Sequence, residues 1–141
     1  VFAGYKVKKV ITQCPHCFNT FRNEYPQFGV NVEVVHHSVL LRDLIAQGKL
    51  SPRKANNVAI AFHESCYLGR HNDIYDAPRE ALAAIPGVAI NEMGKNREEG
   101  FCCGAGGGGM WMEFPGKRIN HLRFGQAMAT GANAVGSTCT Y

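Results

Sequence analysis

The sequence predicts an α/β fold with a mainly parallel sheet flanked by helices. Two observations support this prediction: short segments rich in Val, Ile and Ala alternate with helix-like segments, and several cysteines closely follow the short segments. Strands that alternate with helices usually form a parallel sheet covered by those helices. With 141 residues, of which 45% are hydrophobic, the chain can bury a core, and one globular unit is expected.

Five segments are expected to form strands, because they are short, apolar and bounded by turn or cap residues. They are Lys8 to Thr12, Val30 to Val35, Asn57 to Phe62, Val88 to Ile90 and Ala134 to Ser137. Cys14, Cys66 and Cys139 come soon after the first, third and last of these segments. Ligands of open α/β sheets gather at the carboxyl ends of the strands. We therefore expect the cysteines to meet at that edge of the sheet.

Helices are expected between the strands. The candidate segments are Pro15 to Tyr25, with proline in its first turn; Ser38 to Gln47, which ends at Gly48; a helix capped by Asp76 and ended by Pro86-Gly87; and Gly116 to Thr130, which ends at Gly131.

Composition excludes several classes of protein. The net charge of +4 is scattered, without the basic block that follows a phosphate backbone, so no nucleic-acid partner is expected. No apolar run approaches the roughly 20 residues of a membrane span, and the first residues do not read as a signal peptide. We expect a cytoplasmic chain that does not itself span a membrane. Six cysteines in such a chain favour metal or redox chemistry over disulfide bonds.

An internal repeat supports this interpretation. The segment from Val10 to Cys17 (VITQCPHC) aligns with that from Val135 to Tyr141 (VGSTCTY), so that Cys139 matches Cys14. The sequence stops one residue before the position that would match Cys17. We predict that residues 1–56 are the tail of a first cysteine-rich repeat and residues 57–141 a second repeat lacking its last cysteine, packed as one globular unit. The sequence is then a piece of a longer two-copy protein.

The cysteine spacing is more specific. Thirty-five residues separate Cys66 from Cys102, and 35 separate Cys103 from Cys139. This pattern resembles the cysteine-rich (CCG) domain shared by the catalytic subunits of heterodisulfide reductases, glycolate oxidase iron–sulfur subunits and related membrane-associated Fe–S oxidoreductases. The segments HESCYLGRHNDIYDAPRE and FCCGAGGGGMW extend the resemblance beyond the cysteines, over Asn57 to Tyr141 and the tail of the first repeat.

The resemblance implies an iron–sulfur cluster of the [4Fe–4S] type, which in some family members is non-cubane. Its ligands here would be Cys66, Cys102, Cys103 and Cys139. Cys14 and Cys17 are expected as metal ligands from the first repeat, and Gly104 and Gly106 as residues that contact the cofactor.

The resemblance also implies a role in electron transfer. The chain would be one domain of a larger Fe–S oxidoreductase that passes electrons to a disulfide or a quinone-type acceptor, and would be inactive alone. The expected partners are other redox subunits or domains, either ferredoxin-like or flavoproteins, and the inner face of the membrane is a candidate location for the full-length protein.

Residue chemistry agrees with a cluster. Iron–sulfur clusters take thiolate ligands, which backbone N–H groups and helix N-termini stabilise. The glycine run that begins at Gly104 allows the backbone to pass close to a bulky inorganic centre and to turn N–H groups toward its sulfurs. Adjacent Cys102 and Cys103 can reach two irons of one centre, which a single tetrahedral zinc does not require.

Other interpretations stay open at this point. The cysteines would hold structural zinc in a scaffolding domain, or Cys14 and Cys17, between strand and helix, would form a thiol–disulfide oxidoreductase site. Gly104, Gly106 and Gly109 also fit a dinucleotide-binding pattern, but no hydrophobic strand precedes them. Among the histidines, His63 is the one expected near the cluster, because it ends a strand three residues before Cys66. Trp111 and Met112 are expected either to shield the site or to join the core.

Overall fold

The computed structural model describes residues 1–2, 4–53 and 57–140. The predicted boundary between the two repeats, after residue 56, and the last residue of the repeat alignment, Tyr141, lie outside the described residues.

Parallel strands form two separate sheets. In the first, β1 (Lys9–Thr12) pairs with β2 (Glu33–His36). In the second, β3 (Val58–His63) lies between β4 (Val88–Asn91) and β5 (Ala134–Ser137). The predicted α/β class, the parallel pairing and all five strands are confirmed. The strands divide between two sheets, because β1 pairs only with β2 and β3 only with β4 and β5 in the described part of the chain.

Helices follow the strands as expected, with shifted ends. The α-helices are α1 (Pro15–Asn19), α2 (His37–Ala46), α3 (Asp76–Ala83) and α4 (Ile119–Met128). Helix α1 continues as the π-helix η1 (Thr20–Glu24) and the 3-10 turn η2 (Tyr25–Phe28), and the loops contain the 3-10 turns η3 (Arg97–Glu99) and η4 (Gly106–Trp111).

Two helix predictions need correction. Asp76 does not cap α3: Tyr75 occupies the N-cap position without a side-chain hydrogen bond, and Asp76 is the first helical residue. Its carboxylate accepts a hydrogen bond from Arg97 Nη2 at 2.7 Å instead. Helix α4 begins at Ile119 rather than at Gly116, because Gly116 has a left-handed φ of 84° and Arg118 is extended.

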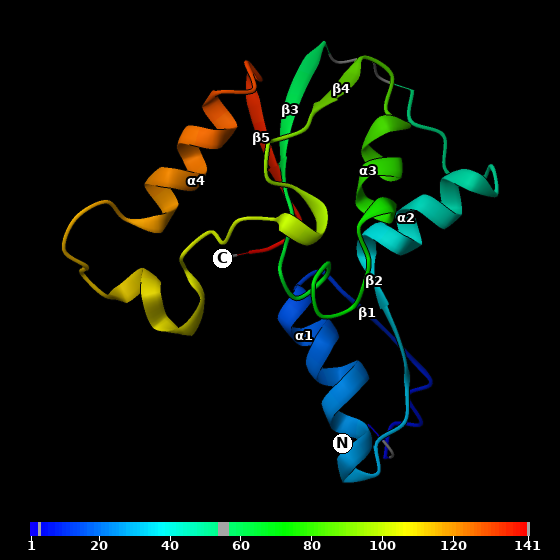
Figure 1. Cartoon of the computed structure of the whole chain (residues 1–141). Coiled ribbons are helices and arrows are strands. Elements are labelled where there is room, and N and C mark those ends of the chain that lie inside the picture. The colour runs from blue at the N-terminus through cyan, green and yellow to red at the C-terminus, as the bar shows by residue number, and fades with distance from the viewer. Residues whose placement is uncertain (3, 54–56, 141) are drawn as a thin grey trace.

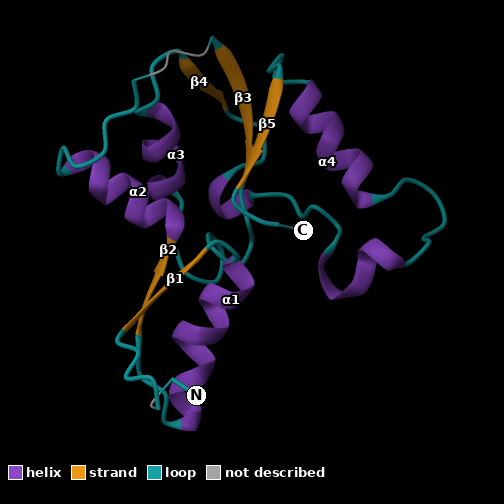
Figure 2. Ribbon diagram, turned by 180° about the vertical axis from the view of Figure 1, so that it is seen from behind, coloured by secondary structure: helices purple, strands orange, loops and turns teal. Residues whose placement is uncertain are grey.

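Helices lie on both sides of the second sheet. Figures 1 and 2 show α4 on one side of β3, β4 and β5, and α2 with α3 on the other. The carboxyl ends of β3 and β5 point toward the start of α1. A small apolar cluster of Ala61, Met93 and Ala127 joins the sheet to α4. No helix within the described residues is both long and apolar enough to span a bilayer.

Candidate cluster-binding site

The carboxyl end of β3 opens onto a cavity of about 290 Å³. Four cysteines line it: Cys66 from the turn after β3, Cys102 and Cys103 from the loop after η3, and Cys139 from the segment after β5. The cavity is about ten times the ~30 Å³ that one water molecule occupies in the liquid. The structure therefore brings together the four cysteines of the Cys, Cys-Cys-Gly, Cys pattern, around a space larger than a single ion.

The turn after β3 fixes Cys66 at the cavity. Glu64 and Ser65 are buried directly after the strand, and the Gly69 N–H donates to the Ser65 carbonyl at 2.9 Å. A Cβ atom at Gly69 would lie 2.5 Å from the ring of Tyr75, so the turn packs closely against that ring. Larger side chains at position 69 would push the turn away from the cavity wall.

The Cys-Cys-Gly turn depends on Gly104. This residue has a φ of 82°, and a Cβ atom there would lie 2.9 Å from Cβ of Ile119. Its N–H donates a hydrogen bond to Cys102 Sγ at 3.2 Å, the kind of bond that stabilises a thiolate. The backbone thus turns an N–H group toward a cysteine thiol.

Gly106 differs from Gly104. It lines the cavity, but its φ lies outside the left-handed region, and a Cβ atom there would meet nothing within 4 Å. Left-handed φ angles occur at Gly107 and Gly108 instead. Contact of Gly104 and Gly106 with a cofactor stays a prediction.

The other three cysteines act on Cys66 electrostatically. Burial raises the pKa of the Cys66 thiol, and the charges of Cys102, Cys103 and Cys139 raise it further. Thiolates that share a cavity repel each other, and cations between them relieve this repulsion. Iron ions of a cluster are cations of this kind, and the donor set is the one that clusters use.

Cys14 and Cys17 lie apart from this cavity wall. Cys14 is the N-cap of α1. Burial acts to raise the pKa of its thiol, but hydrogen bonds from the Cys17 and His16 backbone N–H groups and from the Thr140 side chain outweigh burial, so the pKa lies below its usual value. Burial raises the pKa of the Cys17 thiol, and the hydrogen bond with Cys14 and the charge of Cys14 raise it further. His16 lies between the two groups of cysteines. It lines the cavity, and the distance from its Nδ1 to Cys14 Sγ is 3.9 Å.

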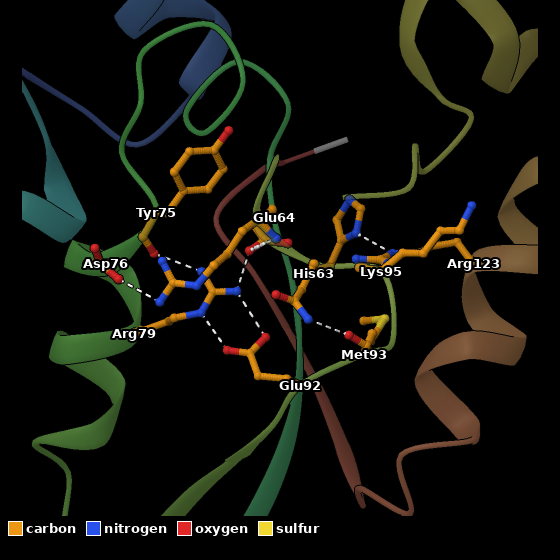
Figure 3. A network of polar contacts seen from close by, with 11 residues as sticks. His63, Glu64, Tyr75, Asp76, Arg79, Glu92, Met93, Lys95 and Arg123 are labelled. Carbon is orange, nitrogen blue, oxygen red and sulfur yellow. Dashed lines mark hydrogen bonds and ion pairs between the residues drawn. The ribbon is translucent and has the colours of Figure 1, made fainter. Parts of the chain in front are cut away.

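A polar network lies beside the cavity (Figure 3), and only part of it has a counterpart among the sequence predictions, namely His63, the histidine expected near the cluster. Arg79 of α3 is buried and forms ion pairs with Glu64 and with Glu92, the latter at 2.5 Å. On the other side, Arg123 of α4 donates from Nε to His63 Nδ1 at 2.9 Å. The helix-like patterns around these arginines do not show that either guanidinium is buried, because long charged side chains are usually solvated.

Trp111 and Met112 lie at the surface of the molecule. Trp111 and Met112 are 84% and 50% exposed, so neither packs into the core. In the part of the chain that the structure describes, no group of three His, Cys, Asp or Glu side chains is close enough to hold a single metal ion.

The fold and the cysteine pattern define a cysteine-rich domain of the CCG type. Residues 60–141 match the family described as "CCG: Cysteine-rich domain", and the chain belongs to this family.

Among curated proteins, the chain is 53% identical to the probable iron-sulfur-binding oxidoreductase FadF of Bacillus subtilis, over 99% of its own length and 20% of that protein. It is 45% identical to EtfAB:quinone oxidoreductase of Syntrophomonas wolfei, over 99% of the chain and 21% of that protein. It is 37% identical to one subunit of the dihydromethanophenazine:CoB--CoM heterodisulfide reductase of Methanosarcina mazei, over 95% of the chain and 34% of that protein.

These relatives are oxidoreductases by name, and the chain spans between about a fifth and a third of their length. The resemblance to heterodisulfide reductases and Fe–S oxidoreductases that the cysteine spacing indicates is confirmed. No solved structure matches the chain.

Proposed function

We propose that this chain is the cluster-binding, electron-transferring domain of a larger iron–sulfur oxidoreductase, with a [4Fe–4S]-type cluster, cubane or non-cubane. One observation carries the proposal: the thiols of Cys66, Cys102, Cys103 and Cys139 line one cavity at the carboxyl ends of β3 and β5. When bound, the cluster supplies one-electron redox chemistry, while the protein sets its position, its potential and its access to water.

The chain's own residues suit this role. The four thiolates would hold the cluster, and the Gly104 N–H already donates to one of them. Ser65, in the cavity wall, has a buried hydroxyl without a hydrogen-bond partner among the described residues. Sulfur ligands that receive hydrogen bonds raise the potential of a cluster. A single zinc ion would instead need its four sulfurs at about 2.3 Å from one point, whereas these cysteines surround a cavity of about 290 Å³.

Donor and acceptor are proposed from the relatives. The names of two relatives specify a quinone and the CoB--CoM heterodisulfide. By analogy, electrons would arrive from a flavoprotein or a ferredoxin-like domain and leave to a quinone or a disulfide. The protein would be cytoplasmic, at the inner face of the membrane.

Cys14 and Cys17 are proposed to be metal ligands of a first cysteine-rich repeat, whose tail would be residues 1–56, with residues 57–141 forming the second. The position of Cys14 supports this assignment, because it follows β1 as Cys139 follows β5. Cys14 also interacts with the side chain of Thr140, the residue after Cys139.

Anaerobic loading with iron and sulfide tests the proposal. The protein at its full natural length should turn brown, absorb broadly in the visible range and give an EPR signal on reduction that Cys103→Ser removes. Substitution of Cys17 by Ser should leave that signal in place. A colourless protein that binds zinc instead would favour a structural metal site, and activity that depends only on Cys14 and Cys17 would favour a dithiol enzyme.

A further inference from the structure

Arg123 is a buried cation with incomplete pairing. Its side chain is 5% exposed, yet its charge has no carboxylate within salt-bridge distance among the described residues. Nη1 donates to the Lys95 carbonyl and to Gln126 Oε1, each at 2.8 Å, and Nε donates to His63. Nη2 has no hydrogen-bond partner in the described part of the molecule. Buried charges are costly unless an opposite charge compensates them.

Two acidic groups face Arg123. Burial lowers the pKa of its guanidinium, and the charges of Glu64 and Cys103 act in the opposite direction. Glu64 pairs with Arg79 and accepts the Arg97 N–H at 2.7 Å, both through Oε1, while its Oε2 has no hydrogen-bond partner among the described residues. Cys103, a proposed ligand, lines one pocket together with Arg123, so its thiolate would bring a second negative charge to the guanidinium.

His63 lines the cavity, and Figure 3 shows its hydrogen bond with Arg123. Because Nδ1 of His63 accepts the hydrogen bond from Arg123 Nε, its ring proton resides on Nε2. The ring lines the cavity together with Cys66 and Cys103, and lies with Cys103 in the wall of a second, more open pocket beside α4. Burial and the Arg123 charge lower its pKa to about 4, so that the ring is neutral near pH 7.

We propose that Arg123 is the buried counter-charge of the cluster site and that it fixes His63 as a neutral N–H donor beside the cluster. Both effects stabilise the reduced, more negative form of the site, and thereby raise its reduction potential. This inference rests on the proposed cluster. Arg123 is a positioning residue, since it acts through its charge and through His63.

The reduction potential is the first measurement. The EPR signal that Cys103→Ser removes is assigned to this site. Its intensity is followed during a redox titration of the protein at its full natural length. Arg123→Gln should lower the midpoint potential by about 59 mV or more, a tenfold change for a one-electron couple. Arg123→Lys, which keeps the charge, should lower it less. Lys117→Gln is the matched control, because Lys117 is exposed, precedes the same helix, and its charge is screened by solvent and salt.

A second measurement does not need the cluster. In the metal-free protein, ¹⁵N NMR should show the His63 proton on Nε2 at pH 7, and Arg123→Lys should populate the other tautomer. This variant also serves if Arg123→Gln fails to fold.

The outcomes separate the two proposals. If the wild-type protein takes up no cluster, the proposed function and this inference fall together. If all variants load and the potential of Arg123→Gln equals that of Lys117→Gln, only this inference is overturned. A His63 proton on Nδ1 in the wild-type protein would also overturn it.

Discussion

Gly104 shows how one residue determines the shape of the site. Its left-handed φ and its approach to Ile119 leave no room for a Cβ atom, while its N–H reaches Cys102 Sγ. Gly104→Ala should therefore lower the free energy of unfolding by about 1 to 2 kcal/mol through backbone strain alone. It should also reduce the iron content after loading. Urea denaturation and iron analysis measure both effects.

Gly106→Ala is the matched control for that substitution. Gly106 lines the same cavity, but its backbone and surroundings accept a Cβ atom. Its free energy of unfolding should stay within about 0.5 kcal/mol of the wild type. Equal losses in the two variants would contradict the role assigned to Gly104.

His36 makes stability depend on pH. The ring is fully buried, Nε2 lies 2.9 Å from the Gln13 carbonyl, and burial, with the charge of His37, lowers its pKa to about 4. The folded state disfavours the protonated ring, so this contribution to stability is complete above pH 6.5 and is lost as the pH falls toward 4. The loss is up to roughly 3 kcal/mol.

Denaturation between pH 7 and pH 4 measures this loss. In His36→Asn, which retains a side chain able to cap α2, the stability should fall less steeply than in the wild type. His121→Asn, at an exposed position on α4, should keep the wild-type slope. An unchanged slope in His36→Asn would show that His36 does not control this pH range.

At the scale of elements, a buried ion-pair network joins α3 to the second sheet. Arg79 pairs with Glu64 after β3 and with Glu92 after β4, and its guanidinium lies 4.9 Å from the centroid of the Phe62 ring. Arg79→Met leaves a buried carboxylate without its cation and should destabilise the protein by about 3 to 5 kcal/mol.

Arg42→Met provides the comparison for Arg79→Met in thermal or chemical denaturation. Arg42 pairs with Asp43 and Glu80, but all three side chains are substantially exposed. The expected loss is about 0 to 1 kcal/mol. If the two variants lose the same stability, the Arg79 network does not stabilise the fold as proposed.

The sequence predicted the elements better than their ends. Strands β3 and β5 follow from short apolar runs, and α2 from its leucines, although Leu41 is 39% and Val135 55% exposed. Asp76 was misassigned because capping depends on the backbone angle at one residue, and Arg97, 21 residues away, takes its carboxylate. The division into two sheets depends on which distant strands pair with each other. The hydrophobic periodicity of each segment does not encode this pairing.

The candidate site shows the same limit. Cysteine spacing was sufficient to group Cys66, Cys102, Cys103 and Cys139, and the structure places all four around one cavity. Cys66 and Cys139 follow strands, whereas Cys102 and Cys103 precede the glycine-rich turn. Arg123 and Arg79 had no sequence signal, since an arginine on an amphipathic helix is usually solvated. Only the tertiary structure shows that their charges are buried.

At the scale of the whole molecule, side chains of α1 and of the turn after Cys66 hold the two sheets together. Asn72 donates to Asn19 Oδ1 at 3.0 Å and to the Tyr67 carbonyl at 2.7 Å, and the Tyr67 ring lies 4.3 Å from that of His16. Asn72→Ala should increase amide hydrogen exchange in both segments, because both lose a half-buried hydrogen-bond partner.

Exchange measured by mass spectrometry tests this coupling. Asn31→Ala, at an exposed position before β2, should leave exchange in both segments unchanged. If Asn72→Ala affected only residues 67–73, α1 would be held by other contacts.

The central claim is that one iron–sulfur cluster occupies the cavity among the four cysteines. Counting iron and acid-labile sulfide in the anaerobically loaded, full-length protein tests it most directly, with wild type and Cys103→Ser compared. The account predicts that the substitution removes about four irons and about four sulfides, as expected for one [4Fe–4S] cluster. Equal iron and sulfide in both proteins, or zinc in place of iron in the wild type, would contradict it.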